Sequence, residues 1–107
     1  HLDRIMRLIL IDNYSGYIFG EFHTANYTGN FDRRACLTEA ATTIDEIQKE
    51  YGRAYTVHSR APRDTRGGYH VYRADVRVPT ITDGQDQEII RAVERDCEFV
   101  GFVEFEK

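Results

Sequence analysis

The sequence has no long apolar run, only two cysteines and no excess of positive charge. No stretch approaches the roughly 18 consecutive apolar residues that a membrane-spanning helix requires, so we expect no membrane span. Proteins that bind nucleic acids usually present strongly basic surfaces to the phosphates, whereas this chain has a net charge of −4. We therefore expect neither a membrane nor a nucleic acid as the partner.

The two cysteines, Cys36 and Cys97, both fall in helix-like patterns beside apolar neighbours. Thiols in such positions are usually buried and chemically inert. One disulfide is arithmetically possible, but the pattern favours two buried thiols in a reducing compartment. We predict that both cysteines are reduced and buried, and that the protein is cytoplasmic.

The length and composition are those of one globular domain. A chain of 107 residues can bury about two-thirds of the surface that its unfolded form exposes, which suffices for a core without disulfides or metals. Hydrophobic residues make up 41% and charged residues 30% of the chain, as in ordinary soluble domains. We predict a single α+β domain over residues 1–107.

Hydrophobic periodicity and turn residues divide the chain into seven elements. The turn chemistry of residues 12–16 joins the first two strands into a hairpin. A helical stripe runs from Cys36 to Tyr51, and Thr82 can form a capping box with Gln85 at the entrance of the second helix. Strands are predicted at 7–12, 17–22, 54–59, 69–78 and 99–106. One helix is predicted at 33–51, and a second after Gln85, with its apolar stripe at 89–97.

The order of these elements is ββαββαβ, which indicates a five-stranded, mostly antiparallel sheet. Packing both helices on one face is the economical way to bury two amphipathic stripes. We therefore predict an α+β fold in which one face of the sheet has no helix over it.

That uncovered face is expected to be apolar, because the first and last strands carry apolar residues on both sides. A large exposed apolar patch usually marks an interface, so we predict a homodimer that packs sheet on sheet. The alternative is that the long loops, with Tyr14, Tyr27 and Phe31, fold back across the face. The predicted dimer interface consists of Ile9, Ile11, Val100 and Phe102.

The sequence contains no recognisable catalytic or metal-binding motif. Its histidines lack the paired spacing of metal ligands, although His58 and His70, on consecutive strands, could be cross-strand neighbours. No cysteine or serine is placed beside a base in a nucleophile pattern, and Gly67-Gly68 is not a phosphate loop. We predict no catalytic residue, no metal and no cofactor.

A local reversal of charge is the most informative feature of the acidic chain. Arginines gather in and beside the third and fourth predicted strands, interleaved with histidine and tyrosine. Because arginine binds carboxylate and phosphate bidentately, this segment could fold over an anionic ligand. The alternative is a solvated loop whose arginines pair with surface acids. The candidate ligand-binding residues are Arg60, Arg63, Arg66, His70, Tyr72 and Arg73.

The segments LIDNYSGYIFGE, YRADV, VPTITDGQDQE and RDCEFV resemble a family of small bacterial proteins of uncharacterised function. The resemblance covers most of the chain. It implies a cytoplasmic bacterial protein, but no activity, cofactor or catalytic residue.

Three functions fit these observations. The first is a binding or interaction module, homodimeric, that binds another protein or a small anion. The second is a small enzyme with a site along the strands of His58, His70, Tyr72 and Arg73. The third is an acidic mimic of nucleic acid, which the arginines disfavour because they interrupt the negative surface.

Overall fold

The computed structural model describes residues 6–24, 32–75 and 77–106. Its elements follow the predicted order ββαββαβ, and the α+β class is confirmed. Among the described residues, neither helix is long and apolar enough to cross a membrane. The elements are β1 (Met6–Asp12), β2 (Ile18–Thr24), α1 (Arg33–Gln48), β3 (Tyr55–His58), β4 (Tyr69–Ala74), α2 (Gln87–Asp96) and β5 (Glu98–Phe105).

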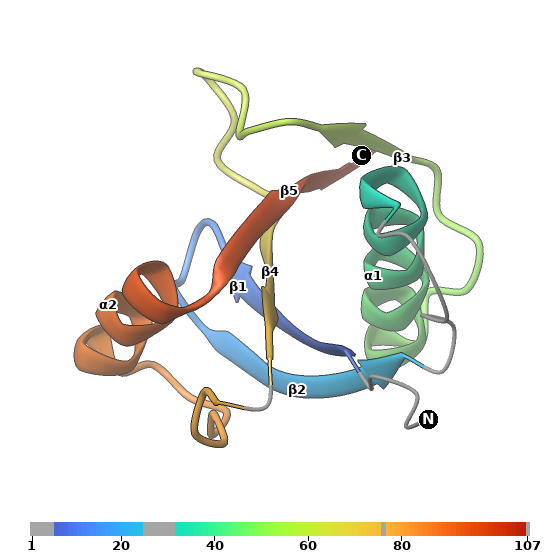
Figure 1. The fold of residues 1–107 in the computed structure, drawn as a ribbon. Helices are drawn as coiled ribbons and strands as arrows, with labels where there is room; N and C mark the ends of the chain where they lie inside the picture. Colours follow the sequence, from blue (N-terminus) through green and yellow to red (C-terminus); the bar gives the residue numbers. More distant parts are fainter. Residues whose placement is uncertain (1–5, 25–31, 76, 107) are drawn as a thin grey trace.

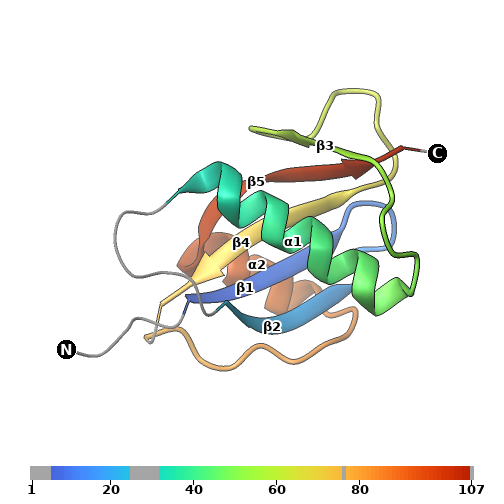
Figure 2. The same ribbon diagram turned by 90° about the vertical axis from the view of Figure 1, so that its right-hand side faces the viewer.

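The described strands form a single five-stranded sheet in the order β2-β1-β4-β5-β3. Each neighbouring pair is antiparallel. Strands β1, β4 and β5 lie in the interior of the sheet, and β2 and β3 form its two edges (Figure 2). Consecutive strands β3 and β4 are therefore not neighbours, because β5 lies between them.

The two helices lie on opposite faces of the sheet (Figure 1), so the prediction that both cover one face was wrong. Leu8 and Leu10 belong to the apolar cluster of α1. Ile9 and Ile11 belong to a second cluster with Val93 of α2. Successive strand residues point to opposite faces, so an unbroken apolar strand needs cover on both sides.

The predicted dimer interface is buried inside the chain. Ile9, Val100 and Phe102 have no exposed surface, and Ile11 is 6% exposed. The alternative cover also fails for Tyr14, which is 81% exposed; Tyr27 and Phe31 lie outside the described residues. Ile9, Ile11, Val100 and Phe102 are thus not available to a second copy, and the homodimer itself stays a prediction.

Helix α1 is shorter than its apolar spacing predicts. Asp32 caps its N-terminus by accepting a hydrogen bond from Ala35 N at 3.2 Å. The helix ends at Gln48 because Lys49 turns into the left-handed region, with φ at 57°. Tyr51, expected as the last member of the stripe, thus lies beyond the helix and is 71% exposed, and Ile47 in the last turn of the helix is 42% exposed.

The buried carboxylate of Asp45 organises the chain that follows α1. It accepts hydrogen bonds from Gly52 N at 2.6 Å, from Arg53 N at 3.0 Å and from Arg53 Nε at 2.7 Å. These bonds lower the pKa of Asp45, and the bond from the Arg53 side chain has the largest effect. The Arg53 guanidinium also lies 3.9 Å above the ring of Phe105. This network draws residues 49–53 away from the helix axis and leads the chain into β3.

Helix α2 begins with a different cap from the one predicted. Asp86 is the N-cap, and its side chain accepts from Glu88 N at 2.9 Å and from Ile89 N at 3.4 Å. The side chain of Gln85 instead donates to Ser15 O at 2.8 Å, so it does not form the expected capping box with Thr82. Residues before Asp86 are thereby tied to the β1–β2 turn.

Neither cysteine is in a disulfide, as predicted. Cys36 is buried on the sheet-facing side of α1, whereas Cys97 is only partly buried, on the opposite side of the sheet. Burial raises the pKa of the Cys97 thiol. The expectation of burial is thus confirmed in full for Cys36 and in part for Cys97.

The burial of β1 on both faces predicts a large effect of Ile9→Ala. Removing a fully buried aliphatic group leaves a cavity and costs about 2–5 kcal/mol of unfolding free energy. The matched control is Ile47→Ala, the same change at a side chain that is 42% exposed, which should cost far less. Urea denaturation followed by circular dichroism measures both, and equal effects would contradict the α2 cover over Ile9.

Candidate functional site

Aromatic and imidazole side chains gather on the α2 side of the sheet. The His70 ring lies 5.0 Å from the ring of Phe102 and 6.0 Å from that of Phe99, between centroids. Tyr72 packs 5.3 Å from Phe99, and His58 packs 6.3 Å from Phe102. His58 and His70 are not direct cross-strand neighbours, because each pairs with Phe102 of β5 from opposite sides.

Asn13, in the β1–β2 turn, positions His70. Its side-chain oxygen lies 2.9 Å from His70 Nε2. Its amide nitrogen donates to Gly67 O at 3.3 Å and to Thr65 O at 3.4 Å, and its backbone N donates to Gly68 O at 2.9 Å. The turn itself is closed by Asp12, whose carboxylate accepts hydrogen bonds from Tyr14 N at 2.7 Å and from Ser15 N at 3.0 Å. The predicted turn is therefore also an anchor for the β3–β4 loop.

His70 is held in one tautomer in its neutral form. Burial lowers its pKa, and the opposing effect of Glu94 is smaller. Because both amide hydrogens of Asn13 are directed at carbonyls, its oxygen faces the imidazole and accepts the Nε2 proton. Nδ1 then carries the lone pair of the neutral ring.

Glu104 anchors the same loop from the side of β5. Its carboxylate accepts a hydrogen bond from Thr65 Oγ1 at 2.8 Å and contacts His58 Nε2 at 3.0 Å. The hydrogen bonds from Thr65 and His58 lower the pKa of Glu104. The base of the loop is thus fastened to the β1–β2 turn through Asn13 and to β5 through Glu104.

Gly68 lets the end of the loop close against Phe102. Its φ of 93° favours glycine, and a Cβ there would lie 2.4 Å from Phe102 Cζ and 2.7 Å from Val103 O. Gly67 beside it has open space around the corresponding position. The close approach of Gly68 helps to bury Phe102 completely.

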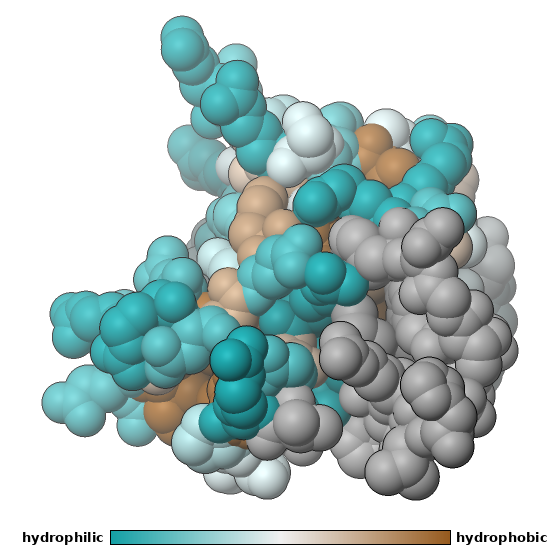
Figure 3. Space-filling view, in the orientation of Figure 1, coloured by the Kyte–Doolittle hydropathy of each residue, from teal (hydrophilic) through white to brown (hydrophobic). Residues whose placement is uncertain are grey.

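Three of the predicted ligand-binding arginines lie together on this loop. We call residues 59–68 the arginine arm; Arg60, Arg63 and Arg66 on it are exposed. No ion pair or hydrogen bond joins their side chains to any residue that the structure describes. The arm projects from the molecule at the upper left of Figure 1, and Figure 3 shows a hydrophilic projection there with a hollow between it and α2.

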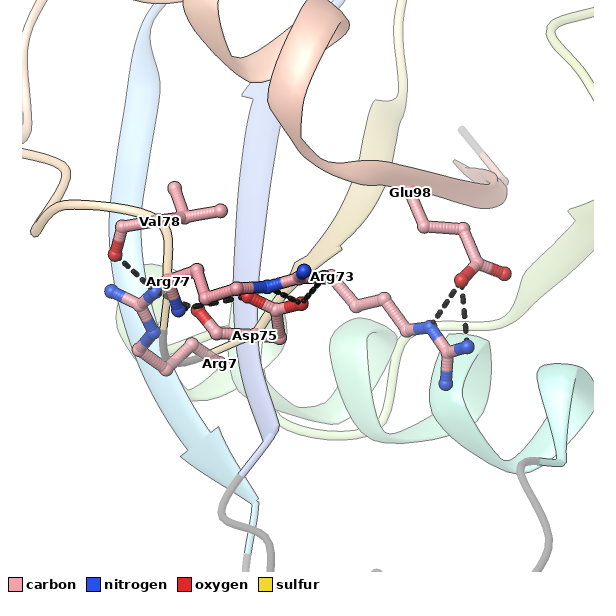
Figure 4. A network of polar contacts seen from close by, with 6 residues as sticks. All are labelled: Arg7, Arg73, Asp75, Arg77, Val78 and Glu98. Carbon is pink, nitrogen blue, oxygen red and sulfur yellow. Dashed lines mark hydrogen bonds and ion pairs between the residues drawn. The ribbon is translucent and has the colours of Figure 1, made fainter.

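Arg73 does not belong to this group, contrary to the prediction. It shares the α1 side of β4 with Val71, whereas His70 and Tyr72 point to the α2 side. Its guanidinium donates to Glu98 at 2.8 and 2.6 Å, as Figure 4 shows. Arg33 of α1 also lies 3.9 Å from the Glu98 carboxylate. Arg73 is therefore part of an ion-pair network at another end of the sheet.

That network holds the chain after β4. The side chain of Arg7 donates to Val78 O at 2.5 Å and also to Asp75 O, and Arg77 pairs with the Asp75 carboxylate at 2.7 Å (Figure 4). These contacts explain why β4 ends at Ala74 and not at 78 as predicted. Within residues 6–24, 32–75 and 77–106, no three His, Cys, Asp or Glu side chains are grouped closely enough to hold a metal ion.

Comparisons with known proteins add no function to this geometry. No protein-family model matches the chain, and neither the curated proteins nor the solved structures give a significant match. The resemblance to small bacterial proteins therefore has no support from these comparisons.

The fit of Gly68 against Phe102 predicts that Gly68→Ala is destabilising. A methyl group in this occupied space, at an unfavourable φ, should cost about 1–3 kcal/mol and loosen the arm. Gly67→Ala is the matched control, because its methyl group meets no neighbour. Thermal unfolding of both variants measures the difference, and equal melting temperatures would show that the arm does not close on Phe102.

The lowered pKa of His70 predicts a loss of stability in acid. The unfolded imidazole takes up a proton near pH 6.5, before the folded one does, so stability falls below about that pH and levels off beneath the folded pKa. His70→Gln should therefore shrink the difference in unfolding free energy between pH 7.5 and pH 5. Urea titrations of wild type and variant at both pH values measure this, and an unchanged difference contradicts it.

Proposed function

We propose that the protein is a binding module for an anionic ligand, which it holds with the arginine arm. The observation that carries the proposal is that Arg60, Arg63 and Arg66 are exposed and unpartnered within the described residues, in a chain of net charge −4. Asp64 is the only acid in the arm, so the arm has a local charge of +2 from three arginines and one aspartate.

The other arginines with described contacts are used differently. Each of them donates to a carboxylate or to a carbonyl oxygen of the same chain. This contrast argues against the alternative in which the arm's arginines pair with surface acids. The internally bonded arginines are Arg7, Arg33, Arg53, Arg73, Arg77 and Arg95.

The arm combines a fixed base with a free tip. Asn13 and Glu104 fasten it at Thr65, Gly67 and Gly68, whereas its guanidinium groups extend into solvent. A ligand therefore binds guanidinium groups on a loop whose base is already ordered, which lowers the entropic cost of binding. Guanidinium groups pair with carboxylate and phosphate in bidentate geometry.

The enzymatic alternative is favoured by one specific observation. Neutral His70 presents Nδ1 as a potential proton acceptor, and Glu94 is close enough to influence the pKa of both His70 and Tyr72. A general base needs such a neutral imidazole near pH 7. The binding proposal needs no reacting group, so it explains the same surface with fewer components.

The proposal predicts that Arg63→Ala and Arg66→Ala each weaken anion binding by about three- to tenfold, as expected for exposed charge-assisted contacts. Isothermal titration with inorganic pyrophosphate and with a hexaglutamate peptide measures the change. The matched control is Arg34→Ala on α1, which removes an exposed arginine that has no hydrogen bond or ion pair to the described residues.

The control should leave the affinity unchanged. Equal weakening by Arg34→Ala would show a nonspecific charge effect. Absence of binding by both anions would overturn the proposal.

A further inference from the structure

The two edges of the sheet differ in what lies beside them. Along β2, Ile18 N donates to Gly84 O at 2.7 Å, and Gly84 N donates back to Ile18 O at 3.1 Å. Gly20 N donates to Asp83 Oδ1 at 2.6 Å. A Cβ at Gly20 would lie 2.4 Å from Ile81 O, so glycine permits this close approach. The segment 81–84 thus covers the first part of the β2 edge.

No described segment covers the opposite edge, formed by β3. Glu106 N donates to Ala54 O at 2.9 Å, which makes these two residues a hydrogen-bonded pair. Because hydrogen-bonded and open pairs alternate in antiparallel strands, Thr56 and His58 bond towards β5. Tyr55 and Val57 direct their backbone N–H and C=O groups outward, where the described residues offer them no partner. Figures 1 and 2 show β3 as the outermost strand.

The two faces of β3 have different chemistry. Tyr55 and Val57 pack against the apolar cluster on the α1 side. His58 lies on the α2 side, against Glu104 and Phe102. The arginine arm begins at the residue after His58, so its cations lie at the end of the same edge. A strand added there would meet apolar side chains on one face, and imidazole and guanidinium groups on the other.

We propose that the β3 edge and the arginine arm together bind an extended peptide segment of a partner protein, with acidic side chains alternating with apolar ones. The peptide adds a sixth strand through the backbone groups of Tyr55 and Val57. Its carboxylates reach the arm, and its apolar side chains extend the α1 side of the sheet. Main-chain pairing supplies affinity and alternate side chains supply specificity in this mode of recognition.

The observations favour a peptide over a nucleic acid. An open strand edge offers N–H and C=O groups in the spacing of another strand, which a phosphodiester chain cannot match. The net charge of −4 also opposes a long polyanion, whereas a short peptide with a few carboxylates needs only the local charge of the arm. This inference rests on the proposed function and gives its anion a chemical class.

The test uses a fluorescein-labelled, end-blocked peptide of sequence Glu-Val-Glu-Val-Glu-Val-Glu with the full-length protein. Fluorescence anisotropy should show saturable binding. Binding should fall at least tenfold for the Lys-Val counterpart and for one of the two peptides N-methylated at alternate residues, because only every second N–H of an added strand faces β3. The other N-methylated peptide should keep its affinity. Arg63→Ala should weaken it, while Arg34→Ala should not.

Amide hydrogen exchange supplies an internal control within β3. Without peptide, the N–H groups of Tyr55 and Val57 should exchange much faster than those of Thr56 and His58. With peptide, only the fast pair should slow, by at least tenfold. Exchange that is unchanged at Tyr55 and Val57 on binding overturns strand addition.

The outcomes separate this inference from the proposed function. One outcome is that pyrophosphate binds and Arg63→Ala weakens this binding, while the N-methylated and unmodified peptides bind equally or not at all. In that case anion binding stands and strand addition is overturned. If a dT12 oligonucleotide binds more tightly than the peptide, a nucleic acid replaces the peptide. If the protein alone dimerises and protects Tyr55 and Val57, a second copy occupies the edge and the inference is overturned.

Discussion

The burial of β1 on both faces is the constraint on which the rest of the structure depends. Leu8 and Leu10 require α1 on one side, and Ile9 and Ile11 require α2 on the other. Polar groups of the covered strands can reach solvent only at the ends and edges of such a two-sided sheet. The candidate site lies at one of these places, where the turn after β1 meets the loop before β4. The same apolar run that fixes the core thus limits where binding groups can be placed.

The link between core and site passes through Asn13. This residue directly follows β1, so its position is set by the most buried strand of the molecule. Its side-chain oxygen orients His70, and its side-chain nitrogen holds the arm by donating to Gly67 O. A disturbance of β1 is therefore transmitted to the imidazole and the arm together. The free arginine tips, by contrast, depend on this anchor only through the backbone of residues 65–68.

Sequence reasoning was reliable where the signal was local. The hairpin, the strand that opens it and the helix spacing all follow from side-chain alternation and turn residues. The same alternation in β4 places Arg73 on the opposite face from His70 and Tyr72. The predicted ligand-binding group missed this because it joined residues that are close in sequence. The end of α1 could not be read in the same way, because Asp45 overrides the apolar spacing with bonds to Gly52 and Arg53. The strand order, which separates His58 from His70, likewise has no local signature.

The cover over β2 has a consequence for stoichiometry. A sheet with two open edges can accept a strand on each side, and head-to-tail contacts of that kind propagate into filaments. Here the segment 81–84 covers the first part of the β2 edge, where Gly20 bonds to Asp83, so a second strand cannot pair with that part of β2. An added strand therefore finds a longer open edge at β3 than at the start of β2, which favours one addition per chain over a filament.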